Sequence, residues 1–414
     1  MPPRAGRTDG IGMTKLLICA TCLCVICTPA WSEDRLVTVD ARTLSGRLVS
    51  VSAETITLAT EAGTQSVRRA DVAQIFLLDD KAPPPPDCLA RAGATVVVTA
   101  AGDALPADDL KLSADRLTFS NPTLGATSVP VAQTTAIYLR HASLSPRAIE
   151  QRCRRMKVEP GAQDVLLLAK QRDNWLIVRG ELGSIDPQSI TIRWKDADHT
   201  VRRRMVPAIY PAATGRKVPV CQGVLTGLDG TTVAFTALAL NGNDFTLELP
   251  GIGRRKVSRK AVATITFRSD RVADLASLKP TDVKEYGFFD RVFHYRVNRA
   301  VGGGALRLGG QTYASGLGLH SFCELSWDLG GAYSSLVARV GIDDAVRPAG
   351  NAQLTFLADG KPLTEPLHLT GKDAPQIVRL KLAKARRLTI RVDFGPDGLD
   401  VSDHVNIAAA RLIK

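Results

Sequence analysis

The last third of the chain holds the side chains best suited to contact a ligand. A histidine stands in the segment YASGLGLHSFCELSWDLGGAY (313–333), two adjacent aspartates follow it, and an aspartate–histidine pair lies near the end. Imidazole and carboxylate groups exchange hydrogen bonds with polar ligands, and carboxylates together with carbonyl oxygens also hold calcium. The candidate site residues are His320, Asp343, Asp344, Asp403 and His404.

Several of these residues also have a purely structural alternative. His320 could satisfy a neighbouring loop carbonyl, and Asp343 and Asp344 could cap a turn. A structural calcium ion at the two aspartates is the only cofactor that the residues suggest. Trp327 alternates with apolar neighbours, which predicts a ring that faces the core.

The sequence lacks the motifs of the common catalytic classes. It contains no P-loop, no G-x-S-x-G nucleophile turn and no H-E-x-x-H zinc motif. Glycoside hydrolysis needs two carboxylates held across a sugar subsite, whereas the acids of the repeats fall at turns. We therefore expect that the protein is not an enzyme, and we assign no catalytic residue.

The chain is basic, with a formal net charge of +12. A basic surface favours acidic partners such as polyanionic polysaccharide, lipid headgroups or nucleic acid. The basic clusters at 202–204 and 254–256 contain no interleaved aromatic residues, which nucleic-acid readers use for base stacking. We expect no nucleic-acid partner.

The first 32 residues have the pattern of a signal peptide. Lys15 precedes the apolar run Leu16–Cys27, and the small residues Ala30 and Ser32 follow. This run is too short to span a bilayer core of about 30 Å, although an uncleaved anchor is the alternative. No other segment is long and apolar enough to cross a membrane. The pattern predicts a secreted protein, either periplasmic or extracellular, with residues 1–32 removed.

Export would permit disulfide bonds. Cys88, Cys153, Cys221 and Cys323 remain after the signal peptide, and four cysteines allow three full connectivities. Their isolation in the sequence argues against a zinc site. The pairing stays open, and a free buried thiol is the alternative for Cys323, which lies in a strand-like segment.

The chain repeats itself between the signal peptide and residue 270. The segment LSGRLVSVSAETITL (44–58) parallels VRGELGSIDPQSITI (178–192), with Gly46 aligned to Gly180. Alternation with period two predicts short antiparallel strands arranged as small barrels or meanders. We divide this region into a first β-repeat pair at 33–141, a helical linker at 142–163 and a second β-repeat pair at 164–270.

The segment 276–414 predicts a β-sandwich or jelly roll. The string RLTIRVDF (387–394) alternates apolar and polar side chains, and Asp359–Gly360 predicts a hairpin turn. Eight to ten such strands with no convincing helix are typical of two packed sheets. The fold class of the whole chain is therefore mainly β.

The same segment carries a family resemblance. The strings SLKPTDVKEYGFF, LRLGGQTYASGLGLHS, WDLGGAYSSLVARVGIDD, ADGKPL and SDHVNIAAARL occur in the order seen in the NPCBM family of carbohydrate-binding modules. The resemblance covers about a third of the chain. It implies a galactose-binding-like β-sandwich that binds carbohydrate, of galactose type or an acidic glycan, without catalysis. It also makes the five candidate residues carbohydrate contacts.

The chain departs from the family pattern at Asn298 and at Asn406–Ile407, where members commonly carry an acid and an aromatic residue. Two functions therefore remain open. The first is a secreted carbohydrate-binding protein whose β-repeats act as a spacer. The second is an envelope structural or protein-interaction protein whose module no longer binds sugar. Exposed aromatic side chains on the module would favour the first.

Overall fold

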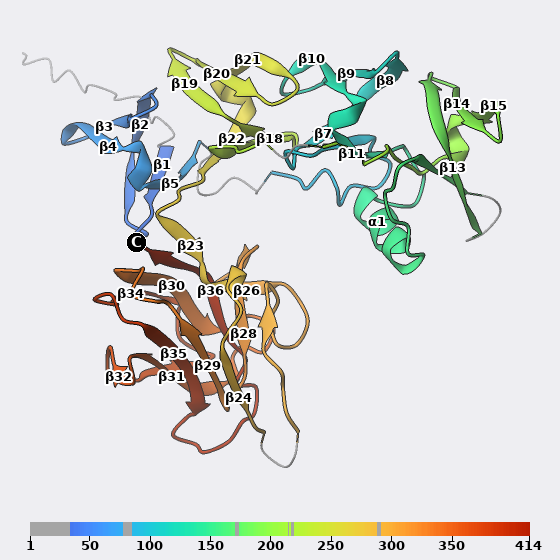
Figure 1. Ribbon diagram of the computed structural model, residues 1–414. Helices are drawn as coiled ribbons and strands as arrows, with labels where there is room; N and C mark the ends of the chain where they lie inside the picture. Colours follow the sequence, from blue (N-terminus) through green and yellow to red (C-terminus); the bar gives the residue numbers. More distant parts are fainter. Residues whose placement is uncertain (1–33, 78–84, 170–173, 214, 217–218, 288–290) are drawn as a thin grey trace, which may run out of the picture. The chain divides into compact units, whose positions relative to one another are not determined.

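The computed structural model describes residues 34–77, 85–169, 174–213, 215–216, 219–287 and 291–414. The predicted signal peptide and the first part of the proline run at 83–86 lie outside these residues. Strands dominate the described chain, and the strand pairs in it are antiparallel (Figure 1). The predicted mainly β class is confirmed.

The strands before residue 270 form four units, and each unit ends in a 3-10 turn followed by a last strand. Unit 1 comprises β1 (Asp34–Thr38), β2 (Thr43–Val51), β3 (Thr55–Thr60), β4 (Gly63–Arg68) and β5 (Val72–Phe76). Unit 2 comprises β6 (Val96–Thr99), β7 (Ala104–Pro106), β8 (Asp108–Ser113), β9 (Arg116–Asn121), β10 (Gly125–Pro130) and β11 (Thr134–Tyr138). Unit 3 comprises β12 (Asp164–Ala169), β13 (Trp175–Ile185), β14 (Ser189–Trp194), β15 (Ala197–Arg202) and β16 (Ala208–Tyr210). Unit 4 comprises β17 (Gly223–Gly227), β18 (Thr232–Phe235), β19 (Ala237–Asn241), β20 (Asp244–Leu249), β21 (Gly253–Ser258) and β22 (Val262–Phe267).

Units 1 and 3 share one pairing scheme. In unit 1, β2, β3 and β4 pair in succession and β5 returns to β1; in unit 3, β13, β14 and β15 pair in succession and β16 returns to β12. Gly46 and Gly180 lie opposite Asp34 and Asp164 respectively. A Cβ atom at either glycine would lie within 2.5 Å of a backbone carbonyl oxygen. These matches support the proposal that 33–141 and 164–270 are two copies of one pair.

The units associate in an order that differs from their order in the chain. Unit 4 pairs with unit 1 through β22–β5 and β19–β2. Unit 3 pairs with unit 2 through β16–β11 and β13–β8. Units 2 and 4 meet where Ala104 of β7 pairs with Thr232 of β18. Strand neighbours therefore run unit 1, unit 4, unit 2, unit 3.

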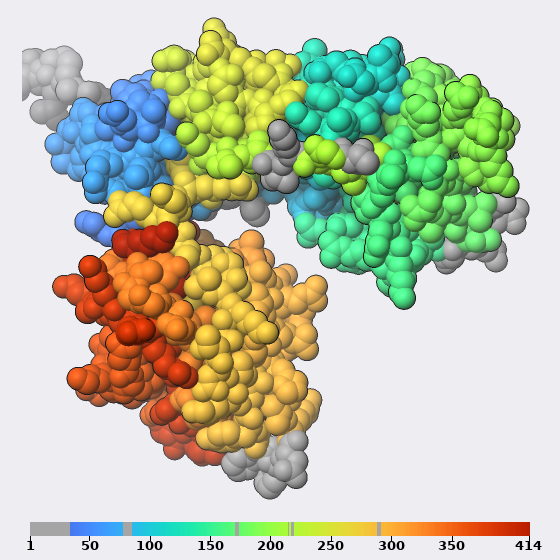
Figure 2. Space-filling view, in the orientation of Figure 1, coloured from blue at the N-terminus to red at the C-terminus, as the bar shows by residue number. Residues whose placement is uncertain are grey.

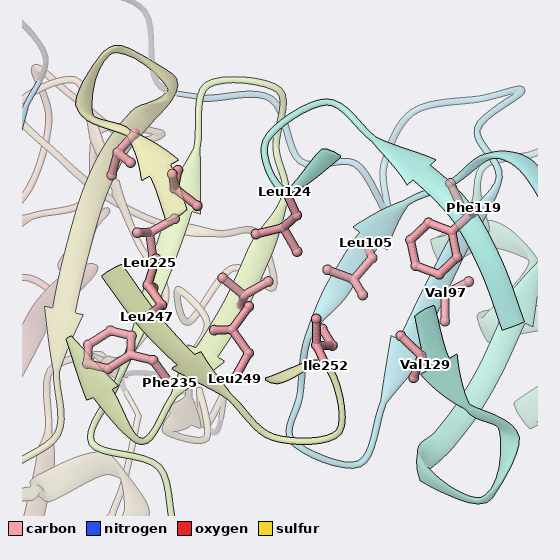
Figure 3. Close-up of a cluster of buried hydrophobic side chains, with 14 of the residues drawn as sticks. Val97, Leu105, Phe119, Leu124, Val129, Leu225, Phe235, Leu247, Leu249 and Ile252 are labelled. Atoms are coloured by element: carbon pink, nitrogen blue, oxygen red, sulfur yellow. The ribbon is translucent and has the colours of Figure 1, made fainter. Parts of the chain in front are cut away.

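The four units share one hydrophobic core, because the inward faces of their alternating strands meet across the unit boundaries. Figure 3 shows part of this core, where Leu105 and Leu124 of unit 2 lie in the same cluster as Leu249 and Ile252 of unit 4. The four units therefore pack into one body. A single unit on its own would not bury this shared core.

The predicted linker contains α1 (Pro146–Arg155), the only α-helix in the described part of the chain. Ser145 caps it by accepting a hydrogen bond from the Ala148 amide at 3.3 Å, and Pro146 stands at the first helical position, where a missing N–H costs nothing. Ile149 and Cys153 face inward against units 2 and 3.

The C-terminal module is a sandwich of two antiparallel sheets, as the alternation predicted. The first sheet runs β25 (Arg296–Val297), β28 (Gly316–Leu319), β36 (Val405–Ile413), β30 (Ser335–Ile342), β34 (Gln376–Lys381), with β23 (Val272–Asp274) on β36. The second runs β24 (Asp282–Glu285), β29 (Cys323–Asp328), β35 (Arg387–Phe394), β31 (Asn351–Ala358), β32 (Lys361–Pro362), with β33 (Leu367–Thr370) on β31. A separate hairpin joins β26 (Leu306–Leu308) to β27 (Gln311–Tyr313). Figure 2 shows one face of the molecule with its side chains, with the module coloured from yellow-orange to red.

Two local expectations are confirmed inside the module. The Trp327 ring is 1% exposed and lies in the core, where its indole N–H donates to the Leu278 carbonyl at 3.0 Å. Asp359 and Gly360 both have positive φ and form the turn between β31 and β32. This is the two-residue hairpin that an Asp-Gly pair favours.

Cys88, Cys153, Cys221 and Cys323 are all buried free thiols in the structure. The free-thiol alternative given for Cys323 therefore describes the structure, and the other three cysteines share this state. No helix within the described ranges is long and apolar enough to cross a membrane.

Candidate functional site

The sheet order brings the five predicted site residues to one end of the module. β36 pairs antiparallel with both β28 and β30, so the ends of β28 and β30 lie beside the start of β36. His320 directly follows β28, Asp343 and Asp344 follow β30, and Asp403 and His404 precede β36.

His320 is fixed inside this end of the sandwich. Its side chain is 2% exposed, and its ring stacks on Phe293 with centroids 4.2 Å apart. Nδ1 lies 2.7 Å from the Ser321 carbonyl oxygen. A carbonyl only accepts hydrogen bonds, so Nδ1 carries the proton and Nε2 is the acceptor when the ring is neutral. His320 therefore uses Nδ1 as its structural alternative predicted, in a hydrogen bond to a neighbouring loop carbonyl.

His404 is the candidate that remains open to a ligand. Its ring is half-buried and meets the His320 ring edge-on with centroids 5.4 Å apart. Burial lowers the pKa of His404, and the neighbouring His320 lowers it further. Neither ring nitrogen of His404 makes a hydrogen bond to any described residue. The site thus presents a neutral imidazole with unused donor and acceptor capacity.

Asp403 holds two loops together. Its carboxylate is 1% exposed and accepts hydrogen bonds from the Ser321 hydroxyl at 2.6 Å and the Asn351 amide at 2.9 Å. Burial raises the pKa of Asp403 in spite of these two bonds, which favour the charged form. Asp403 positions the chain beside His320 and His404.

Asp343 and Asp344 organise turns, as their capping alternative predicts. The buried Asp343 carboxylate accepts from the Ala345 amide and from the Asn406 side chain. Asp344 accepts from the Gly309 and Gly310 amides at 2.9 and 2.8 Å. No group of three or more His, Cys, Asp or Glu side chains suited to a metal ion occurs in the described part of the chain.

Asn406 keeps one polar atom without a partner. Its side-chain nitrogen donates to the Arg307 carbonyl oxygen and to Asp343, which fixes the orientation of the amide. The amide oxygen is buried and accepts no hydrogen bond from the residues that the structure describes. Such a group is costly in a folded protein, and it lies next to the candidate site.

The sequence reasoning missed the aromatic residues that surround His320. Tyr286 follows β24, is 53% exposed, and stacks on Phe322 with centroids 4.1 Å apart and planes 13° from parallel. Backbone hydrogen bonds in both directions join Tyr286 to Phe322, which lies two residues after His320. The string EYGFF was visible in the sequence, but its alternation does not reveal that the Tyr286 ring faces solvent.

The fold and site can now be compared with known proteins. Residues 273–413 match the NPCBM/NEW2 domain, and this segment is a domain of that kind. A Renibacterium salmoninarum protein named "Putative endo-alpha-N-acetylgalactosaminidase" is 33% identical over 90 residues. The match covers 22% of this chain and only 6% of that protein.

Two solved structures are also similar to parts of the chain. A CBM51 module of a Clostridium perfringens GH95 protein, in complex with methyl-galactose, is 21% identical and covers 34% of this chain and 99% of its own, with a TM-score of 0.31. The tandem CBM51 modules of a family 98 glycoside hydrolase from Streptococcus pneumoniae are 12% identical and cover 92% of this chain and 87% of their own, with a TM-score of 0.29.

Proposed function

We propose that this is an exported, non-catalytic carbohydrate-binding protein that binds sugar at the end of the module where β28 and β30 meet β36. The NPCBM/NEW2 domain supports this proposal at the level of a carbohydrate-binding module. The repeat units then act as a spacer or as a second adhesive surface.

One observation carries the proposal: a partly exposed, neutral His404 ring, whose nitrogens form no hydrogen bond with a described residue, lies at the same end as the exposed Tyr286 ring. A sugar offers hydroxyl groups and one mildly apolar face. His404 can exchange hydrogen bonds with hydroxyls, and Tyr286 can cover the apolar face. The phenyl ring of Phe322 and two backbone hydrogen bonds hold Tyr286 in place before a ligand arrives.

The carboxylates at this site already accept hydrogen bonds from the protein. We therefore expect a neutral sugar as the ligand. Asp343 and Asp403 are buried and spend their oxygens on backbone and side-chain donors, so they position loops and do not contact the ligand. A shallow site of this kind binds at about millimolar to micromolar dissociation constants, or about −4 to −8 kcal/mol.

Titration calorimetry of the full chain with galactose and with N-acetylglucosamine tests the proposal. Tyr286→Ala should weaken binding by about two- to tenfold, since a ring contact contributes about 0.5–1.5 kcal/mol. His404→Ala should weaken it by about fivefold, the value of one hydrogen bond.

Tyr333→Ala is the matched control, because Tyr333 packs half-buried just before β30 begins, at the opposite end of that strand. It should leave the affinity unchanged. If no glycan on an array binds the wild-type chain, the alternative of an envelope structural or protein-interaction protein replaces the carbohydrate proposal.

Export has a separate test. Expression in an exporting host should yield a mature N-terminus at Glu33 by mass spectrometry. Full-length protein retained in the cytoplasm would contradict the proposed periplasmic or extracellular location.

A further inference from the structure

A groove of about 1150 Å³ opens in the repeat units, outside the module. One side is lined by the segment that leads into unit 2 and by the 106–110 stretch of that unit. The other side is lined by residues 187–188 and 202–204 of unit 3. The strand pairs β11–β16 and β8–β13 join these two units.

Arg203 fixes the two sides of the groove to each other. Its guanidinium donates to the Leu110 carbonyl oxygen of unit 2 at 2.7 Å and to the Asp186 carbonyl oxygen of unit 3 at 3.1 Å. Both acceptors are backbone atoms, so this half-buried cation is held in place without a salt bridge to an acid.

The other positively charged side chains of the groove are exposed and have no partner among the described residues. Four arginines line it whose side chains form no ion pair or hydrogen bond with any described residue: Arg91, Arg140, Arg202 and Arg204. Guanidinium groups are the preferred partners of carboxylate and sulfate, because their N–H groups match two acceptor oxygens at once.

The acids of the groove are fewer. Asp229 accepts hydrogen bonds from the Thr123 and Thr231 hydroxyls and is therefore occupied. Asp108 and Asp109 are exposed. Among the described residues of the lining, four free arginines and two free aspartates give a net positive charge that an anionic ligand would neutralise.

The rest of the lining decides which anionic ligand fits. The described residues that line the groove include no Phe, Tyr or Trp, so they do not supply the stacking that single-stranded nucleic acids use. They also include none of the large exposed apolar side chains found in the described ranges, so a protein partner would lack its usual hydrophobic anchor. The groove is also larger than the 300–1,000 Å³ typical of a single small ligand. We infer that it binds an extended acidic polysaccharide through its four free arginines, as a second site independent of the neutral-sugar site of the module.

Binding of the full chain to polygalacturonate and to dextran sulfate, with neutral dextran as the uncharged comparison, tests this inference. Binding of both acidic polymers would show that the groove binds anionic polysaccharide. The polymer that binds more tightly identifies carboxylate or sulfate as the preferred group. Arg140→Gln with Arg204→Gln should weaken acidic-polymer binding by about tenfold, because two exposed charge-assisted contacts are lost. Raising salt from 50 to 200 mM should weaken the wild type by about tenfold or more and the variant by less.

Arg193→Gln with Arg268→Gln is the matched control. Both arginines are exposed in units 3 and 4, lie outside the groove, and change the net charge by the same amount. Equal weakening by this control would overturn the site, because binding would then follow net charge alone. Tighter binding of polyglutamate or single-stranded DNA than of either acidic polysaccharide would overturn the ligand class, and so would equal binding of neutral dextran. Tyr286→Ala should leave acidic-polymer binding unchanged. The acidic-polymer site of the groove and the sugar site of the module are therefore tested independently.

Discussion

Arg259 of unit 4 forms an ion pair with Asp34 of unit 1, although 225 positions separate the two residues in the chain. The same guanidinium donates to the Leu48 carbonyl oxygen at 2.7 Å, and the Asp34 carboxylate accepts from the Leu48 amide at 2.5 Å. The Asp34 side chain is 3% exposed. This ion pair joins units 1 and 4 beside the strands through which the two units pair.

The matching position in unit 3 offers a test of that contact. Asp164 accepts from the Leu182 amide at 2.6 Å, as Asp34 does from Leu48, but its second partner is the Ala212 amide and not an arginine. Asp34→Ala should destabilise the protein by about 3 kcal/mol, because it leaves Arg259 partly buried without its acid. Asp164→Ala should cost about 1–2 kcal/mol. Urea unfolding measures both, and an equal loss in the two variants would show that the ion pair contributes nothing beyond its hydrogen bonds.

His320→Ala should lower both stability and sugar affinity. A histidine that only contacted sugar would affect affinity with an intact fold, but the His320 ring is buried and stacked on Phe293. We expect a loss of about 1–3 kcal/mol in unfolding free energy from the missing contacts. His368→Ala, at an exposed position on β33, is the control for removing an imidazole. Unchanged thermal unfolding of His320→Ala would contradict the packing role.

The half-buried His404 should make stability depend on pH. Its pKa is lowered in the folded protein by burial and by His320. Below its ordinary value of about 6.5, the unfolded chain binds a proton that the folded chain does not, so stability falls as the pH falls. The wild type should therefore lose stability relative to His404→Asn between about pH 7 and pH 5. Denaturant unfolding at each pH measures the difference, and parallel curves for the two proteins would refute the shift.

The four thiols of residues 33–414 should be unreactive in the native protein. All four are buried, and burial raises the pKa of Cys88 to about 11. Since the thiolate is the reactive form, a thiol reagent at pH 8 should modify none of them before unfolding and all four afterwards. Fewer than four reactive thiols in unfolded, unreduced protein would reveal a disulfide bond.

The sequence by itself determined the features that depend on neighbours within a few residues. Alternation at Leu388, Ile390 and Val392 predicted the strand β35 and its buried face, and all three side chains are fully buried. The helical linker predicted at 142–163 contains α1, which begins at Pro146 directly after its cap Ser145. Such features follow from backbone preference and from which side of a strand or helix each side chain occupies, which local sequence encodes.

Only the tertiary structure decided which distant segments meet. The approach of Arg259 to Asp34 and the placement of β36 between β28 and β30 join segments that no local pattern connects. The exposure of Tyr286 was equally hidden, because a strand's end residue faces solvent or core according to what packs against it. Each of these outcomes depends on the burial of apolar faces over the whole chain. Both candidate binding sites could therefore be located only from the tertiary structure, in which the strand pairing is known.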